Sequence, residues 1–232
     1  MNKAITSQKQ FYNDWDYGQF SKTKAERILA YFPKGNRRKK LLDVACGEGQ
    51  FYEYLKNKNV DYIGIDFAKK QIKKGKKKGL NLSYGDLTKK WPFKDKSFDI
   101  VLASEIIEHI FDTDYFLQEA RRVLKKDGVL ILTTPNVCYL GARIRCLFGR
   151  RPPVIECRAG GGNAGHIRAF SAGDLKLLLN ENGFIIEKYV GDDFYLPFGI
   201  SSNTKIFGRL CDLLSYLFPR LASGFIIKAE VK

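Results

Sequence analysis

The sequence predicts an α/β fold with a doubly wound, Rossmann-like, mostly parallel sheet of seven strands, an antiparallel last strand and helices on both faces. Three observations predict it. Short apolar runs alternate with helical stretches, and the first run leads straight into a glycine-bearing turn. The final run alternates apolar and polar residues after a helix that ends at Pro219. The 232 residues, 44% of them hydrophobic, suffice for one domain with a full core.

The expected strands follow one another in a regular order. The first begins at Leu41, and the others cover residues 61–66, 80–86, 98–103, 128–133, 184–190 and 224–231. Between the fifth and sixth strands, Ser171 is expected to cap a helix that Gly183 ends, and Asp112 is expected to begin the helix after the fourth strand. This alternation predicts parallel pairing, with the carboxyl ends of the strands at one edge of the sheet.

Three segments complete the single domain that we expect over residues 1–232. Residues 1–35 are expected to form an N-terminal helical cap rich in aromatic side chains. Residues 137–170 carry six arginines and a glycine-rich run, and are expected to form a basic substrate loop or lid over an anionic acceptor. Residues 204–218 have apolar residues at helical spacing and are expected to form an amphipathic helix that covers the sheet as core, with a membrane-surface face or a dimer contact as alternatives.

The formal net charge of +15 is concentrated in short stretches. One lies at residues 37–40, and another at residues 69–78, where seven lysines crowd one expected helix and its end. A solvated helix face explains such a cluster, and so does a docking surface for an acidic membrane or a nucleic acid. The solvated face is the favoured interpretation, because neither cluster is expected on the side where the carboxyl ends of the strands open.

The compartment is expected to be the cytoplasm. The chain opens with no secretory leader, and no apolar run approaches the length that crosses a bilayer. The five cysteines are scattered without a Cys-x-x-Cys pair, which is typical of reduced thiols.

A small-molecule site is predicted where the first strand meets its turn, in the run Leu-Leu-Asp-Val-Ala-Cys-Gly-Glu-Gly from Leu41 to Gly49. The spacing of Gly47 and Gly49 lacks the third glycine of a dinucleotide fingerprint. Asp43 and Glu48 would also repel a pyrophosphate. Both acids suit a ligand that carries an ammonium and a sulfonium group, which S-adenosylmethionine does.

Two later carboxylates extend this site. Asp66 ends the second strand, where a carboxylate can accept hydrogen bonds from both ribose hydroxyls. Asp86 ends the third run in a Gly-Asp pair and is expected to accept an adenine amino proton.

Residues 41–136 contain, in order, Asp-x-x-Cys-Gly-x-Gly, Gly-x-Asp, Gly-Asp, Glu-x-x-Glu-His and Thr-Pro-Asn. In this order the motifs resemble those of the class I S-adenosylmethionine-dependent methyltransferases, of the methyltransferase type 11 and ubiquinone-biosynthesis O-methyltransferase kind. The resemblance implies a cofactor site formed by Asp43, Ala45, Gly47, Gly49, Asp66, Phe67, Asp86, Leu87 and Ser104. Ala45 replaces the family's first glycine, and we expect a negative φ there, which alanine tolerates.

Only two histidines, His109 and His166, are available as general bases for a hydroxyl acceptor, and His166 is the first choice. Alternatively, Glu105, Glu108, His109 and His166 converge on a divalent ion such as magnesium, manganese, iron or zinc. This set is similar to that of two metal-using families, the ubiquinone-biosynthesis O-methyltransferases and the small-RNA 3′-terminal 2′-O-methyltransferases. A purely structural role for His109, capping a turn, remains the third interpretation.

The sequence therefore predicts an S-adenosylmethionine-dependent O-methyltransferase. Beyond Asn136 the chain looks like methyltransferases of glycan and lipid biosynthesis, which implies a small or glycan- or lipid-linked anionic acceptor, with peripheral membrane contact as an option. Metal-dependent RNA 2′-O-methylation is the second hypothesis, drawing on the positive charge. The third is a non-catalytic partner subunit, because the domain also resembles MetW-like proteins.

Overall fold

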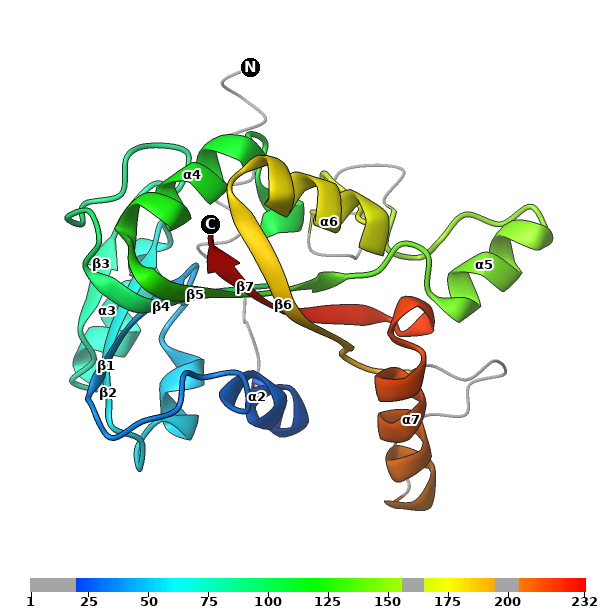
Figure 1. The fold of residues 1–232 in the computed structure, drawn as a ribbon, viewed down its shortest axis with the longest axis horizontal. Helices are drawn as coiled ribbons and strands as arrows, with labels where there is room; N and C mark the ends of the chain where they lie inside the picture. Colours follow the sequence, from blue (N-terminus) through cyan, green and yellow to red (C-terminus); the bar gives the residue numbers. More distant parts are fainter. Residues whose placement is uncertain (1–19, 156–164, 195–204) are drawn as a thin grey trace. The chain divides into compact units, whose positions relative to one another are not determined.

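The computed structural model describes residues 20–155, 165–194 and 205–232. In order along the chain (Figure 1), the elements are α2 (Lys22–Leu29), β1 (Lys39–Val44), η1 (Gln50–Tyr54), β2 (Val60–Asp66), α3 (Lys69–Lys77), β3 (Leu82–Tyr84), β4 (Phe98–Ser104), η2 (Ile107–His109), α4 (Thr113–Val123), β5 (Leu124–Pro135), α5 (Leu140–Leu147), α6 (Ala172–Glu181), β6 (Phe184–Gly191), α7 (Lys205–Leu217), η4 (Pro219–Leu221) and β7 (Gly224–Val231).

The seven strands lie in the order β3-β2-β1-β4-β5-β7-β6. β1 pairs in parallel with β2 and with β4, and β2 pairs in parallel with β3. β6 and β7 run antiparallel, because the Asp192 N–H donates to Gly224 O near one end and the Lys232 N–H donates to Gly183 O near the other. The predicted fold class is confirmed.

The described residues fall into two compact units. The first contains residues 20–103, 115–131 and 231, and the second contains residues 104–114, 132–155, 165–194, 205–230 and 232. The motifs expected to hold the cofactor lie in the first unit, apart from Ser104. The histidines and the glutamates of the expected metal site lie in the second.

The core of the first unit is built on strands whose buried stretches are mostly apolar, with Asp43 of β1 and Asp99 of β4 as the buried exceptions. β4 is buried from Phe98 to Ala103, and Leu41 and Leu42 of β1 are both fully buried although they point to opposite faces. A strand buried on both faces reads as a continuous apolar run, which explains why the sequence predicted these strands well. α3 packs on β2 and β3 (Figure 1).

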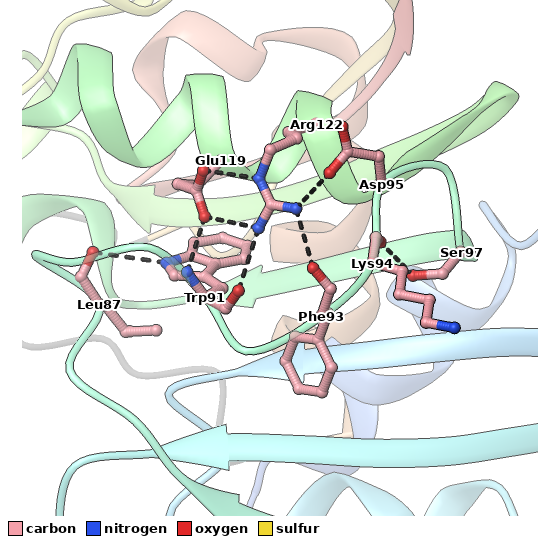
Figure 2. A network of polar contacts seen from close by, with 8 residues as sticks. All are labelled: Leu87, Trp91, Phe93, Lys94, Asp95, Ser97, Glu119 and Arg122. Atoms are coloured by element: carbon pink, nitrogen blue, oxygen red, sulfur yellow. Dashed lines mark hydrogen bonds and ion pairs between the residues drawn. The ribbon is translucent and has the colours of Figure 1, made fainter.

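Arg122 of α4 ties that helix to the segment before β4 (Figure 2). Its guanidinium donates to the two carboxylate oxygens of Glu119, both at 2.7 Å, and to Asp95 at 2.6 Å. It also donates to the backbone oxygens of Trp91 and Phe93, at 3.1 and 2.8 Å. Burial alone would raise the pKa of Glu119, but the bonds from Arg122 and from the Trp91 N–H bring it below its usual value. The network fixes the path of the chain into β4.

In the second unit, α6 begins with Ser171 as its N-cap, as predicted. Ser171 Oγ accepts the Asp174 N–H at 3.3 Å, and the Asp174 carboxylate accepts the Ser171 N–H at 2.9 Å, which forms a capping box. α7 packs through Cys211 against Phe194 and Ala222.

Three sequence-based expectations need correction. The alternation of strands and helical stretches predicts a helix between the first two strands, but the glycine turn is followed only by the five-residue 3-10 helix η1. The segment expected as a loop contains α5, whose Leu140 packs on the cluster of Cys211.

The third correction concerns α7, which was expected to bury its apolar stripe. Its buried side is narrow and includes Cys211 and Ser215, while several large apolar side chains stay exposed: Leu210 at 42%, Leu213 at 53%, Tyr216 at 70% and Leu217 at 54%. Most of the aromatic residues of the expected N-terminal cap, Phe11, Tyr12, Trp15 and Tyr17, lie outside the described residues.

Across the described parts of the chain, no helix is long and apolar enough to span a bilayer.

Candidate functional site

The turn after β1 adopts a left-handed backbone at three positions. The φ angles are +61° at Ala45, +55° at Gly47 and +87° at Gly49. The expected negative φ at Ala45 is therefore wrong. The Ala45 and Cys46 N–H groups both donate to Ile65 O, at 2.8 and 3.2 Å, and this pair of bonds holds the turn against β2. A Cβ in this region costs about 1–2 kcal/mol, so Ala45 is strained.

Asp66, at the end of β2, closes the same turn from the other side. One carboxylate oxygen accepts the Gly47 N–H at 2.8 Å, and the other accepts the Ala68 N–H at 2.7 Å. The side chain is buried, so desolvation raises the pKa of Asp66, although these backbone donors oppose that effect. The Phe67 N–H is a third backbone donor to this carboxylate, so one of its four lone pairs is left to accept a ligand hydroxyl.

Asp43 lies in β1 next to this turn. It is only 4% exposed and accepts the Tyr62 hydroxyl at 2.7 Å. Desolvation raises the pKa of Asp43 to about 7; the Tyr62 hydrogen bond acts in the opposite direction, and the charge of Asp66 adds to the rise. Two buried carboxyl groups with raised pKa values favour a cation beside them, because a positive charge stabilises their ionised forms.

Glycines without a left-handed backbone keep the site compact. A Cβ on Gly64 would lie 2.6 Å from Cys46 Sγ, and a Cβ on Gly75 of α3 would lie 2.6 Å from Glu48 O. The turn after β1 therefore fits against β2 and α3 only because Gly64 and Gly75 have no side chain. Glu48 itself pairs with Lys78 at 3.2 Å, which partly neutralises the charge that was expected to face the cofactor.

The remaining cofactor candidates follow β2, β3 and β4. Phe67 directly follows β2 and is half-buried, and Leu87 lies three residues after the end of β3 and is buried. The Asp86 carboxylate accepts the N–H and the hydroxyl of Thr88, at 3.1 and 2.7 Å. Ser104 ends β4, belongs to the second unit and shares a hydrogen bond of 2.9 Å with Thr133 Oγ1.

Three of the four expected metal ligands lie together in the second unit. One ligand atom each from Glu108, His109 and His166 falls within 4.8 Å of the others. The two imidazole rings meet edge to face with centroids 4.9 Å apart. Glu108 is buried and accepts the Thr134 hydroxyl at 2.9 Å, while His109 and His166 are half-buried.

Both imidazoles are oriented through the same nitrogen. His109 Nδ1 lies 3.3 Å from Gly165 O, and His166 Nδ1 lies 3.4 Å from Val154 O. A carbonyl oxygen only accepts, so each Nδ1 carries the proton, and in the neutral ring the lone pair is on Nε2. This is the arrangement in which second partners orient histidine ligands.

Glu105 does not join this group, which corrects the expectation of four ligands. Its carboxylate accepts the Thr133 hydroxyl at 2.7 Å, and its N–H donates to Thr133 O at 3.0 Å. Its φ of +51° turns the chain sharply after β4. Glu105 is exposed, whereas Glu108 is buried.

Arginines of the segment over residues 137–170 donate to backbone carbonyls, both within that segment and in the chain after η2. Arg168 donates to Ile110 O at 3.0 Å and to Phe111 O, and Arg143 donates to Cys138 O at 2.6 Å. These bonds order the segment and engage part of the donor capacity that was expected to capture an anion. Arg158 and the glycines at positions 160–162 lie outside the described residues.

The sequence reasoning missed Tyr62, the partner of Asp43, and Thr133 and Thr134, the partners of the two glutamates. A tyrosine in an otherwise apolar strand, and two threonines at the end of a buried strand, are polar groups that need partners. That requirement is the signal that could have found them.

A family model described as a methyltransferase domain matches residues 42–132. The ubiquinone biosynthesis O-methyltransferase of Pelagibacter ubique is 36% identical over 101 residues, which is 42% of each chain. The mitochondrial ubiquinone biosynthesis O-methyltransferase of Bos taurus is 31% identical over 207 residues, covering 83% of this chain and 55% of the relative. This chain spans about half the length of the curated relatives that it matches.

Solved structures are similar over nearly the whole chain. An S-adenosylmethionine-dependent methyltransferase from Thermotoga maritima is 19% identical, covers 100% of this chain and 94% of its own, and has a TM-score of 0.65. One from Archaeoglobus fulgidus is 21% identical, with 89% and 92% covered and a TM-score of 0.61. At these identities the likeness shows the fold.

Proposed function

We propose that this chain, which belongs to the class I S-adenosylmethionine-dependent methyltransferase family, transfers a methyl group from that cofactor to an oxygen of an anionic acceptor. The observation that carries the proposal is the pair of buried carboxyl groups, Asp43 and Asp66, on either side of a left-handed turn. The choice of oxygen rests on relatives named as O-methyltransferases.

The residues present fit this cofactor. S-adenosylmethionine carries a positive charge. Burial disfavours the ionised form of Asp43 and raises its pKa to about 7, and a cation beside the carboxylate would stabilise that ionised form. Asp66 would accept a ribose hydroxyl while it keeps the Gly47 N–H in place. Asp86 would accept the adenine amino proton, with Phe67 and Leu87 beside the ring system. When bound, the cofactor supplies an electrophilic methyl group that an acceptor oxygen attacks in line.

The acceptor hydroxyl needs a group that takes its proton. His166 is our first choice and His109 the second, because each holds its proton on Nδ1 and has a lone pair on Nε2 with which to accept another. The carbonyl oxygens that orient the two rings also fix which nitrogen does this work.

Alternatively, the same residues fit a divalent metal ion, in which case the Nε2 lone pairs bind the ion and do not take the acceptor's proton. Glu108 would supply a carboxylate oxygen, and His109 and His166 would supply Nε2 atoms, a donor set that zinc, manganese and iron(II) accept. A bound ion would lower the pKa of an acceptor hydroxyl. Thr134 would hold the Glu108 carboxylate in its orientation through the 2.9 Å hydrogen bond.

Glu105 and Glu108, three residues apart, offer a matched test of the metal site. Binding of zinc or manganese to metal-stripped protein is measured by calorimetry in the wild type, in Glu108→Gln and in Glu105→Gln. We expect Glu108→Gln to weaken binding by roughly tenfold or more, in line with the loss of a ligand, and Glu105→Gln to leave it unchanged. Equal affinities in all three proteins, or no binding in the wild type, would remove the metal from the proposal.

The cofactor site is tested by binding of S-adenosylmethionine to Asp66→Ala, with Asp61→Asn as the control. Asp61 lies on the same strand but is exposed. We expect Asp66→Ala to abolish binding and Asp61→Asn to retain it, after which acceptors that carry vicinal hydroxyls and an anionic group are screened for methyl transfer. A well-folded wild-type protein that binds no cofactor would favour the non-catalytic partner hypothesis instead.

A further inference from the structure

The first unit carries a second feature outside the cofactor turn, a shallow hollow of about 570 Å³ on α3 and β3. It is lined by Lys69, Ile72, Lys73, Lys76, Lys77 and Tyr84. None of these six residues is among the cofactor or metal candidates. Tyr84 is the last residue of β3, a three-residue strand at the edge of the sheet, and Lys69 is the first residue of α3.

The hollow has an apolar floor and a cationic rim. Ile72 is buried, Tyr84 as a residue is 50% exposed, and Lys69 Nζ lies over its ring at 5.1 Å from the centroid. The four lysines are exposed, and none makes an ion pair with a residue that the structure describes. Lys78, just after α3, differs from them because it pairs with Glu48.

The lysines lie along one face of the helix. They occupy positions 69, 73, 76 and 77, spacings of four, three and one that keep them on one side of an α-helix. At 1.5 Å per residue, the first and last are about 12 Å apart along the helix axis. α3 contains no acidic residue that would neutralise this row.

We propose that this hollow binds single-stranded nucleic acid. The ammonium groups would contact successive phosphates along the row, and one base would stack on the exposed face of Tyr84. A cationic groove that tracks the backbone, together with an aromatic platform for a base, is how proteins bind single strands without reading their sequence. The formal net charge of +15 adds long-range attraction for a polyanion.

Two observations favour a polymer over the other anions. The hollow is open, so a small nucleotide would stay largely solvated, whereas a strand continues past both ends and contacts every lysine. An acidic bilayer is less suited, because the aliphatic side chain of α3 in the hollow, Ile72, is buried and offers nothing for insertion. The proposal concerns docking and does not depend on whether the bound strand or another molecule accepts the methyl group.

The test is fluorescence anisotropy with a labelled twelve-nucleotide single-stranded RNA over a range of salt concentrations. Four phosphate contacts predict a slope of log K against log[salt] of about −2.8 for the wild type. The triple variant Lys69→Gln/Lys73→Gln/Lys77→Gln should reduce the slope to about −0.7. The control Lys58→Gln/Lys74→Gln/Lys89→Gln removes the same charge from exposed lysines outside the hollow, one of them on α3 itself, and should keep the slope near its wild-type value.

Stacking is tested separately at Tyr84. Tyr84→Ala should weaken RNA binding on the order of tenfold, whereas Tyr84→Phe should retain it, because both rings offer a stacking face. Thermal unfolding of each variant shows whether it folds, and Tyr84→Phe keeps the stacking test interpretable if Tyr84→Ala does not. Equal loss in the two lysine triples would overturn the proposal, since it would reflect total charge alone. Binding of the wild type to anionic vesicles but not to RNA would also overturn it.

Discussion

Replacing Asp43 by asparagine should make the protein more stable at neutral pH while it removes a cofactor-binding group. The carboxyl group is buried, and desolvation raises its pKa from 3.8 to about 7. Above that pH the folded protein must hold a buried negative charge that the unfolded chain keeps in water. Asparagine has nearly the same shape and no charge, and its carbonyl oxygen can still accept the Tyr62 hydroxyl.

The sign and size follow from proton binding. Between about pH 4 and pH 7 the folded protein holds a proton on Asp43 that the unfolded chain has lost, so each pH unit lowers the free energy of unfolding by about 1.4 kcal/mol. Over the three units of the shift this amounts to about 4 kcal/mol. The loss is complete above the folded pKa, and it is absent below the unfolded one.

The assay is urea unfolding of the wild type and of Asp43→Asn at several pH values from about 4 to 8. The difference between the two free energies isolates Asp43, because carboxylates with lowered pKa values, such as Glu119, contribute equally to both proteins. We expect the free energy of unfolding of Asp43→Asn, relative to that of the wild type, to increase steadily up to about pH 7 and then to stay constant. A difference that does not change with pH would refute the reasoning.

Three further substitutions test the packing around the site. Ala45→Gly should raise the free energy of unfolding by about 0.5–1 kcal/mol, because the relief of left-handed strain exceeds the entropy that glycine adds to the unfolded chain; a lower melting temperature would contradict this. Gly64→Ala should lower it by about 2 kcal/mol in urea unfolding, since the new Cβ meets Cys46 Sγ at 2.6 Å, and an unchanged midpoint would show that the turn yields freely. Arg122→Leu should lower the free energy of unfolding by about 3 kcal/mol, because Glu119 would keep a largely buried charge with only the Trp91 N–H as a donor. A loss below about 1 kcal/mol in urea unfolding would mean that the network of Figure 2 adds little stability.

The fold could be predicted because its central strands carry their own signal. The buried stretches of β4 and β1 are mostly apolar and lead into turns, and β7 matches its expected range over Gly224–Val231. α7 shows the limit of this reasoning. An apolar stripe predicts a helix, but it does not say how much of the stripe finds a partner, and here Leu213 and Leu217 stay half-exposed.

The candidate site could be predicted by residue but not by geometry. The order of the motifs identified Asp43, Asp66 and His109, and the presence of only one other histidine identified His166. The structure places the two aspartates in the first unit and the two histidines in the second. The sequence could not show that Glu105 turns away toward Thr133, because glutamates three apart after a strand look equivalent until the backbone path is known. The sequence also could not show the positive φ of Ala45, because that angle depends on hydrogen bonds to the neighbouring strand β2.

The central claim is that the buried carboxyl pair of the first unit binds the positively charged cofactor, and proton release tests it most directly. At about pH 6 most Asp43 side chains are protonated in the free protein, and a cation beside them should drive the proton off. S-adenosylmethionine is titrated calorimetrically in buffers of different ionisation enthalpy. We predict release of about one proton per cofactor near pH 6, and tighter binding as the pH rises through 7. Binding without proton release, with the same affinity at pH 6 and pH 8, would contradict the account.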